Sequence, residues 1–307
     1  MNQSHNVAAS VRTRLKNKST SAREDVSVIL TRYTLERFLY RISQSLYKEQ
    51  FILKGALLFS VWSDQPHRPT RDLDLLGRGN NTLSYLEQVF SDICQIMVPV
   101  DGLEFNPNTI KSQKIKEDQE YEGVRINLQA NLAGTRTRIP VQIDIGFGDV
   151  VTPAPLFLEF PPLLDFPAPQ LLVYPRETVV AEKFQAIVML GIANSRLKDF
   201  YDLWFLSQNF EFEGKTLCQA IKTTFARRRT SLPELIPLGL TADFAEDKNK
   251  VNQWKAFVSK TKLLAQPPSL SEVVSILLKF LWPPTQGAAK GETFQKFWSP
   301  QGNWQEK

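Results

Sequence analysis

The chain has 307 residues, enough for two domains of ordinary size or for one large domain with appendages. Hydrophobic residues make up 42% and charged residues 22%, and the net charge is +5, which is typical of a globular protein that buries a core. No run of about 18 apolar residues predicts a membrane helix, and residues 1–25 lack the apolar stretch of a signal peptide. We expect a cytoplasmic protein without a membrane partner.

The scarce residue types exclude several kinds of catalytic site. Two cysteines and two histidines are too few for a thiolate zinc site or a multi-histidine metal centre. His5 lies near the chain end, and we expect His67 to be a solvated loop residue. Carboxylate and lysine chemistry is therefore what the chain can offer.

Apolar periodicity divides the first half of the chain into helices and strands. Residues 51–62 are mostly apolar and give a mixed helix and strand signal, and we expect a helix that begins near Gly55. Elsewhere, helical spacing indicates helices and alternation indicates strands. The predicted helices are 7–18, 24–43 and 82–98, and the predicted strands are 70–76, 124–132 and 139–147.

The second half is predicted to be mostly helical. Residues 152–169 hold six prolines, which indicates an extended linker. The predicted helices that follow are 177–190, 197–208, 215–228, one near 244–263 and 270–281. We therefore expect an α+β protein with an N-terminal helical segment (1–50), an α/β core (51–170), a helical domain (171–282) and a loose, polar tail (283–307).

The sharpest local feature is the pair Asp72 and Asp74, two positions apart on a predicted strand. Such side chains project from the same face, and carboxylates that close repel one another unless a cation lies between them. Oxygen ligands suit Mg²⁺ or Mn²⁺, ions that also bind phosphates. A pair of exposed surface acids is the alternative.

Asp144 is a polar position in an otherwise apolar strand. A third carboxylate from a neighbouring strand would complete a site for two divalent ions, which can stabilise the attacking and leaving oxygens of a nucleotidyl transfer. An exposed strand acid is the alternative. Taken together, the three acids favour the metal site.

A second constellation combines Lys183 with Asp202 in the helical part. A lysine that reaches a triphosphate, oriented by an acid, is the functional interpretation. Ion pairs between packed helices, either Lys183 with Asp202 or Arg196 with Asp199, are the structural interpretation, and the residues by themselves favour it.

Basic residues are concentrated in residues 215–262, which contain ten lysines and arginines and only four acidic residues. This segment contains Arg227, Arg228 and Arg229 in succession. The run could contact nucleic-acid phosphates, although charge alone slightly favours a solvated helix face.

Several separated motifs, in order, resemble the AbiEii/AbiGii toxin family of nucleotidyltransferases. The resemblance covers roughly residues 5–280. Its motifs are NVAASVRTRL, LTRYTLERFLYRIS, FILKGALLF, RPTRDLDLL, PVQIDIGFGD, AEKFQAI, SRLKDFYDLWFL and FARRRTSLP.

The resemblance implies a DNA polymerase β-like nucleotidyltransferase fold, a mixed sheet flanked by helices with a helical C-terminal domain. It also implies roles for individual residues. Asp72 and Asp74 would hold divalent ions, Asp144 would be the third metal-binding catalytic acid, Lys183 would contact the nucleotide phosphates and Asp202 would complete the catalytic set. Lys54, Gly55, Arg68 and Thr70 would line the nucleotide site. Ala56 follows Gly55 where many relatives have serine or glycine, so a backbone N–H is the expected phosphate contact there.

The implied activity is transfer of a nucleoside monophosphate from a nucleoside triphosphate, with Mg²⁺ or Mn²⁺, to an acceptor such as the 3′ end of tRNA. Arg227, Arg228 and Arg229 would help to bind that RNA. The implied biology is that of a toxin with a cognate antitoxin. Two alternatives use the same residues: a metal-dependent phosphoesterase or nuclease, and a non-catalytic protein that binds RNA or an antitoxin.

Overall fold

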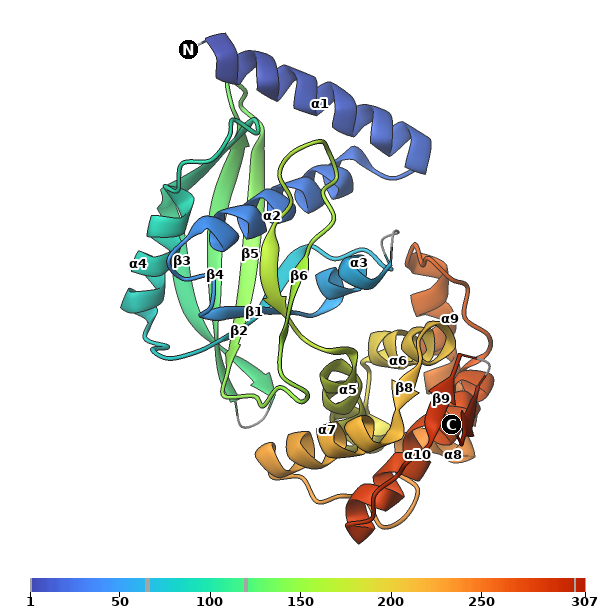
Figure 1. Ribbon diagram of the computed structural model, residues 1–307. Coiled ribbons are helices and arrows are strands. Elements are labelled where there is room, and N and C mark those ends of the chain that lie inside the picture. Colours follow the sequence, from blue (N-terminus) through green and yellow to red (C-terminus); the bar gives the residue numbers. More distant parts are fainter. Residues whose placement is uncertain (1, 64–66, 119–120, 301, 307) are drawn as a thin grey trace. The chain divides into compact units, whose positions relative to one another are not determined.

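The computed structural model describes residues 2–63, 67–118, 121–300 and 302–306 (Figure 1). The chain forms two compact units. The first unit contains Met1–Gly148 and Leu156–Val173, and the second contains Asp149–Pro155 and Tyr174–Lys307. Among the described residues, no helix is both long and apolar enough to cross a bilayer.

The first unit is built on a seven-stranded mixed sheet. The strands follow one another across it in the order β3-β4-β5-β2-β1-β7-β6. The β2–β5 and β1–β7 pairs are parallel and the other pairs are antiparallel. The strands are β1 (Phe51–Lys54), β2 (Asp72–Gly77), β3 (Leu103–Asp118), β4 (Tyr121–Leu132), β5 (Arg138–Phe147), β6 (Leu156–Glu159) and β7 (Gln170–Val173). This mixed arrangement confirms the predicted α+β class.

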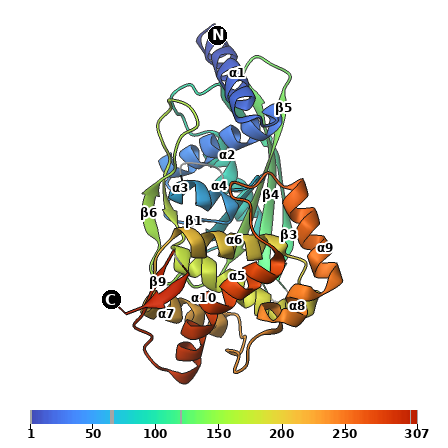
Figure 2. The same cartoon turned by 90° about the vertical axis from the view of Figure 1, so that its right-hand side faces the viewer.

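Helices pack against this sheet (Figures 1 and 2). Helix α2 (Val26–Gln44) packs on β5 and β7, α4 (Leu83–Cys94) packs on β3, and α1 (Asn2–Ala22) lies against α2. Helix α2 starts where the Asp25 side chain accepts a hydrogen bond from the Ser27 amide, an ordinary N-cap. After β1, the short helices η1 (Ala56–Leu58) and α3 (Phe59–Trp62) follow Gly55. The helix expected near Gly55 is thus preceded by a strand.

A buried ionic network fastens α2 to the rest of the first unit. Asp101 accepts hydrogen bonds from Arg37 at 3.1 Å and from Arg41 at 2.7 Å. Glu36 accepts a hydrogen bond from the Leu163 amide at 2.7 Å. Burial raises the pKa of Glu36 to about 7, because charging a carboxyl away from water is costly.

The second unit is mostly helical. Helix α7 packs against α5 and α10, and α10 also packs against α6. A small sheet has the order β10-β9-β8. The elements are α5 (Arg176–Leu190), η2 (Gly191–Ala193), α6 (Leu197–Asn209), β8 (Phe212–Glu213), α7 (Gly214–Arg227), η3 (Leu238–Leu240), α8 (Ala242–Glu246), α9 (Lys248–Lys260), α10 (Leu270–Lys290), β9 (Phe297–Ser299) and β10 (Asn303–Gln305).

The C-terminal tail is docked, contrary to the prediction that residues 283–307 are loose. Helix α10 continues through Pro283 and Pro284, which cannot donate the backbone hydrogen bonds to the carbonyls four residues earlier. The indole N–H of Trp304 donates to those two carbonyls, Lys279 O and Phe280 O, at 3.1 Å each. The tail therefore repairs the defect that the prolines create.

The segment 152–169 is also more ordered than the predicted linker. It contains β6, which pairs with β7 at the edge of the large sheet. Extended, proline-rich chain is compatible with an edge strand, where a missing N–H need not break a ladder.

Candidate active site

One face of the large sheet carries two polar rows. Residues paired in register across neighbouring strands share a face, and so do residues two positions apart on one strand. The first row runs Asp72, Gln142, Asn127, Lys111 across β2, β5, β4 and β3. The second runs Lys54, Asp74, Asp144, Arg125, Gln113 across β1, β2, β5, β4 and β3. The apolar row Leu73, Ile143, Ile126 lies between them in sequence and is fully buried, which fixes the polar rows on the opposite face.

The register brings the three predicted acids together. Asp74 lies directly beside Asp144 in the parallel β2–β5 pair, and Asp72 lies one row away. Asp72 and Asp74 are half-buried, whereas Asp144 is buried. Three carboxylates thus share a small area of one sheet face.

Gly55 follows β1 and lies against the Asp74 carboxylate. A methyl group added at Gly55 would lie 1.9 Å from Asp74 Oδ2, far inside contact distance. The backbone φ of Gly55 is +74°, a conformation that disfavours side chains. The preceding residue, Lys54, is the in-register partner of Asp74 and is buried. Sequence reasoning assigns both residues to the nucleotide site, and the structure places both beside Asp74.

Arg125 on β4 binds Asp144 through one edge of its guanidinium. Its Nε and NH2 each donate to one carboxylate oxygen at 2.7 Å, and the Gln142 amide donates to the same carboxylate at 3.3 Å. The hydrogen bond to Asp144, and the charges of Asp144, Asp72 and Asp74, raise the pKa of Arg125. Arg125 is not among the residues predicted from sequence, because its place beside the acids depends on the pairing of β4 with β5.

The oxygen donors of Asp72 and Asp74 fit a divalent ion. Among the described residues, no group of three or more histidine, cysteine, aspartate or glutamate side chains is arranged to hold a metal ion. Asp144, also expected as a metal ligand, forms an ion pair with Arg125. Mg²⁺ commonly uses one or two carboxylates together with water and substrate phosphates, so the oxygen donors of Asp72 and Asp74 suit such an ion.

The loop before β2 holds the remaining candidates of the first unit. Thr70 Oγ1 is hydrogen-bonded with the backbone of Asp72, accepting from its amide at 3.4 Å and donating to its carbonyl at 3.3 Å. Arg68 is half-buried in the same loop. His67 is buried and stacks on Phe59 with 4.0 Å between ring centroids, so it is not the solvated residue that the sequence predicts.

A groove extends from Asp72 along the first polar row. Its volume is about 520 Å³. It is lined by Arg71 and Asp72 of the loop and β2, Gln142 of β5, Asn127 of β4, Lys111 of β3 and Thr31 of α2, among others. We call this hollow the strand groove.

In the second unit, Lys183 sits in a buried ionic cluster. Its Nζ lies 2.6 Å from Asp199 Oδ1 and 2.8 Å from Asp202 Oδ2, and both aspartates are fully buried. Arg196 binds the other oxygen of Asp199 at 2.7 Å. Both ion pairs of the structural interpretation are therefore present. Asp199, which sequence reasoning treats only as an ion-pair partner, is as close to Lys183 as Asp202 is.

The arginine run does not act as a uniform basic surface. Arg227 and Arg229 are exposed. The Arg228 guanidinium binds Asp149 at 3.1 Å and Glu182 at 3.4 Å, and it donates to the Gln185 side chain. The prediction that Arg228 binds RNA therefore conflicts with its ion pairs, which fit a structural role inside the second unit.

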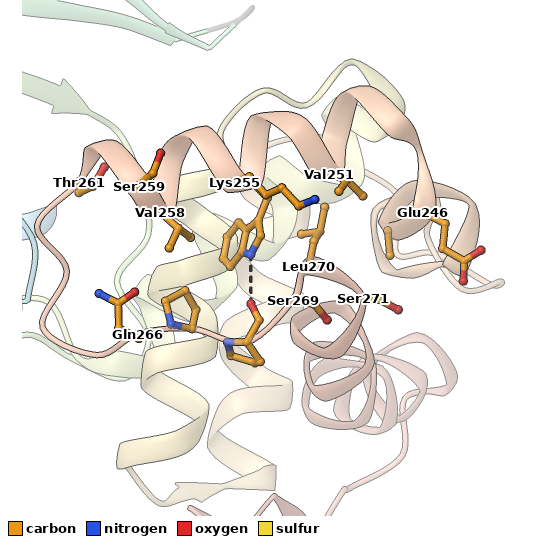
Figure 3. Close-up of a pocket in the computed structure, with 14 residues that line it drawn as sticks. Glu246, Val251, Lys255, Val258, Ser259, Thr261, Gln266, Ser269, Leu270 and Ser271 are labelled. Carbon is orange, nitrogen blue, oxygen red and sulfur yellow. Dashed lines mark hydrogen bonds between the residues drawn. The ribbon is translucent and has the colours of Figure 1, made fainter.

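The second unit also has a cavity of its own, between α9 and the segment that leads into α10 (Figure 3). Its volume is about 920 Å³. Trp254 lines it and donates from its indole N–H to Pro268 O at 3.1 Å. None of the predicted site residues lines this cavity, so it is separate from the candidate catalytic groups.

The mixed sheet, its flanking helices and the helical second unit correspond to the nucleotidyltransferase fold. The family model for the nucleotidyl transferase AbiEii toxin of Type IV toxin–antitoxin systems matches residues 37–276. The chain belongs to this family.

Two solved structures from Helicobacter pylori are similar to the chain. JHP933 is 17% identical with a TM-score of 0.47, over 84% of this chain and 90% of that one. A second protein, described as a candidate nucleotidyltransferase, is 16% identical with a TM-score of 0.46, over 86% and 95%. No curated protein sequence matches the chain significantly.

Proposed function

We propose that the protein transfers a nucleoside monophosphate from a nucleoside triphosphate to an acceptor hydroxyl at the 3′ end of tRNA. It would act in the cytoplasm as the toxin of a pair with a cognate antitoxin. The observation that carries the proposal is the placement of Asp72, Asp74 and Asp144 on one sheet face with Gly55 pressed against Asp74. Membership of a nucleotidyltransferase family supports it.

The acids of β2 would hold the divalent ion, Mg²⁺ or Mn²⁺. When bound, such an ion neutralises phosphate charge and lowers the cost of charge that develops in phosphoryl transfer. Asp144 is the proposed third catalytic acid, and Arg125 keeps its carboxylate in a fixed orientation. Because Arg125 uses one lone pair of each oxygen, an ion at Asp144 would share the carboxylate with a cation that repels it.

The triphosphate would lie on the β1 side of Asp74. There the absence of a side chain at Gly55 lets the Asp74 carboxylate lie directly against the backbone that follows β1, and Lys54 contributes positive charge. Arg68 and Thr70, in the loop before β2, would orient the same nucleotide. Most of the rate enhancement would come from positioning and charge stabilisation, as in other phosphoryl transfers.

Lys183 would neutralise the departing pyrophosphate. Asp199 and Asp202 hold its ammonium in place from the buried side, so Asp202 acts as a positioning residue. Arg227 and Arg229 remain candidates for contact with the RNA backbone because both are exposed.

The test is transfer of label to RNA. Purified protein is incubated with Mg²⁺, total tRNA and each α-³²P nucleoside triphosphate in turn, beside Asp74→Ala. The proposal predicts label in tRNA with the wild type alone. Label on a protein would show that the acceptor is a protein and not RNA. Hydrolysis of RNA without a nucleotide would favour the phosphoesterase or nuclease alternative, and RNA binding without any reaction would favour the non-catalytic one.

A further inference from the structure

The strand groove lies on the opposite side of Asp72 from the proposed triphosphate site. Strand β1, which leads to Lys54 and Gly55, pairs with one edge of β2. Strand β5 pairs with the other edge, and the row that begins at Asp72 continues there through Gln142, Asn127 and Lys111 on β5, β4 and β3. In a displacement at phosphorus, the attacking and leaving oxygens lie on opposite sides of the reacting atom. The strand groove, on the side of Asp72 away from the proposed triphosphate, is therefore in a position to hold the attacking group.

Two cations mark the groove. Arg71 and Lys111 both line it and both are exposed. Within the part of the chain that the structure describes, neither makes a hydrogen bond or an ion pair, although the charge of Arg71 acts on Asp25. Arg125, on the same face, is by contrast ion-paired with Asp144. Arg71 and Lys111 are thus available to an anionic ligand.

Side-chain amides and hydroxyls lie between these cations. Asn127, Gln129, Gln142 and Thr31 line the groove, and Asn127 and Gln129 make no side-chain hydrogen bond to any described residue. An amide can donate and accept at once, which matches ribose hydroxyls and base edges. None of the described residues that line the groove is aromatic, so the groove offers no aromatic platform for base stacking.

We propose that the strand groove binds the single-stranded 3′ end of the acceptor RNA, with backbone phosphates at Arg71 and Lys111 and the terminal hydroxyl next to Asp72. This inference rests on the proposed function. The volume of about 520 Å³ suits the end of one strand rather than a duplex. The charge and amide pattern favours RNA over a protein acceptor, because phosphates require cations and 2′-hydroxyls require groups that both donate and accept.

Direct binding tests the groove without any need for catalysis. The probe is an RNA hairpin with a single-stranded 3′ overhang and fluorescein at its 5′ end, titrated with protein at several salt concentrations in the absence of nucleotide. The double variant Arg71→Gln/Lys111→Gln should raise Kd on the order of tenfold or more. It should also reduce the slope of log Kd against log salt by about 0.7 for each RNA phosphate that the variant no longer neutralises.

The matched control is Lys114→Gln. Lys114 is an exposed lysine on the same strand β3, but its odd spacing from Lys111 places it on the other face. It should leave Kd unchanged, and a blunt hairpin should abolish the difference between wild type and double variant. An unchanged Kd in a double variant with wild-type melting temperature would overturn the proposal.

Kinetics separate the two possible occupants of the groove. If the acceptor lies there, Lys111→Gln raises KM for RNA several-fold and leaves KM for the nucleoside triphosphate unchanged. A rise in KM for the nucleotide alone would place the nucleotide in the groove and overturn the proposal. A wild type that binds the overhang through Arg71 and Lys111 but transfers no nucleotide would support the groove while contradicting the proposed function.

Discussion

Arg125 and Asp144 form a two-pronged ion pair on adjacent strands, with 2.7 Å between each nitrogen and its oxygen partner. The same guanidinium lies within electrostatic range of Asp72 and Asp74. A protein cation therefore neutralises part of a three-carboxylate cluster that would otherwise repel itself. The pair implies electrostatic competition between Arg125 and any divalent ion that binds beside the third acid.

Removal of Arg125 should strengthen the binding of a divalent ion. Arg125→Ala leaves three carboxylates without the arginine that neutralises them. The folded variant should therefore be less stable than the wild type without metal, and Mn²⁺ should raise its melting temperature by more. The measurement is the melting temperature with and without Mn²⁺, since a ligand of the native state raises it by mass action. The control is Arg138→Ala, an exposed arginine at the start of β5. Equal Mn²⁺ shifts in wild type and Arg125→Ala would refute the competition.

Gly55→Ala should abolish most of the transfer activity while it lowers the free energy of unfolding only modestly. The new methyl group would collide with Asp74 Oδ2 and push the carboxylate away, and a displacement of about 1 Å can cost about a hundredfold in rate. The matched control is Gly79→Ala, which has a similar φ of +84° but no atom within 4 Å of the added carbon. Both variants should carry backbone strain of about 1–2 kcal/mol, and only Gly55→Ala should lose activity. Comparable activity in the two would show that the close approach to Asp74 has no role.

Lys183 should have separable structural and catalytic roles. Lys183→Met leaves Asp202 buried without its cation, and breaking a buried pair costs about 3–5 kcal/mol. Lys183→Met/Asp202→Asn removes the uncompensated charge and should recover much of the free energy of unfolding, measured by urea denaturation. Transfer activity should stay absent in the double variant. Recovery of activity together with stability would mean that the lysine is structural only.

Glu36 should make stability depend on pH in a defined window. Its pKa rises from 4.5 to about 7 on folding, so between these values the folded state binds more protons than the unfolded state. The free energy of unfolding should therefore fall as pH rises from about 4.5 to 7 and then level off. Glu36→Gln should flatten this part of the profile, and Glu49→Gln, at an exposed position, should not. A profile unchanged by Glu36→Gln would contradict the assignment.

The predicted acids are accessible to sequence reasoning because strand alternation reveals which side chains share a face. Asp72 and Asp74 stand out against Leu73 and Leu75, and Asp144 stands out against Ile143 and Ile145. The residues that pair with these acids cannot be predicted from strand alternation. Arg125 comes to Asp144 through the register of β4 with β5, a long-range pairing that no local pattern encodes.

The C-terminal tail shows a second limit. Pro283 and Pro284 correctly signal a break in the helical hydrogen-bond ladder, but the indole of Trp304, twenty residues later, supplies the missing donor. Local propensity predicts the break, and a tertiary interaction removes it. The strand β3 escapes sequence reasoning for a related reason: its bulge between Asn106 and Lys111 interrupts the alternation that would have revealed it.

The position of label in the products tests the central claim most directly. The reaction is run with α-³²P and with γ-³²P nucleoside triphosphate, Mg²⁺ and tRNA, using wild type and Asp74→Asn of confirmed fold. We expect the α label to enter RNA and the γ label to leave as pyrophosphate with the wild type, and neither to occur with Asp74→Asn. Transfer of the γ label to RNA, or full activity in Asp74→Asn, would contradict the claim.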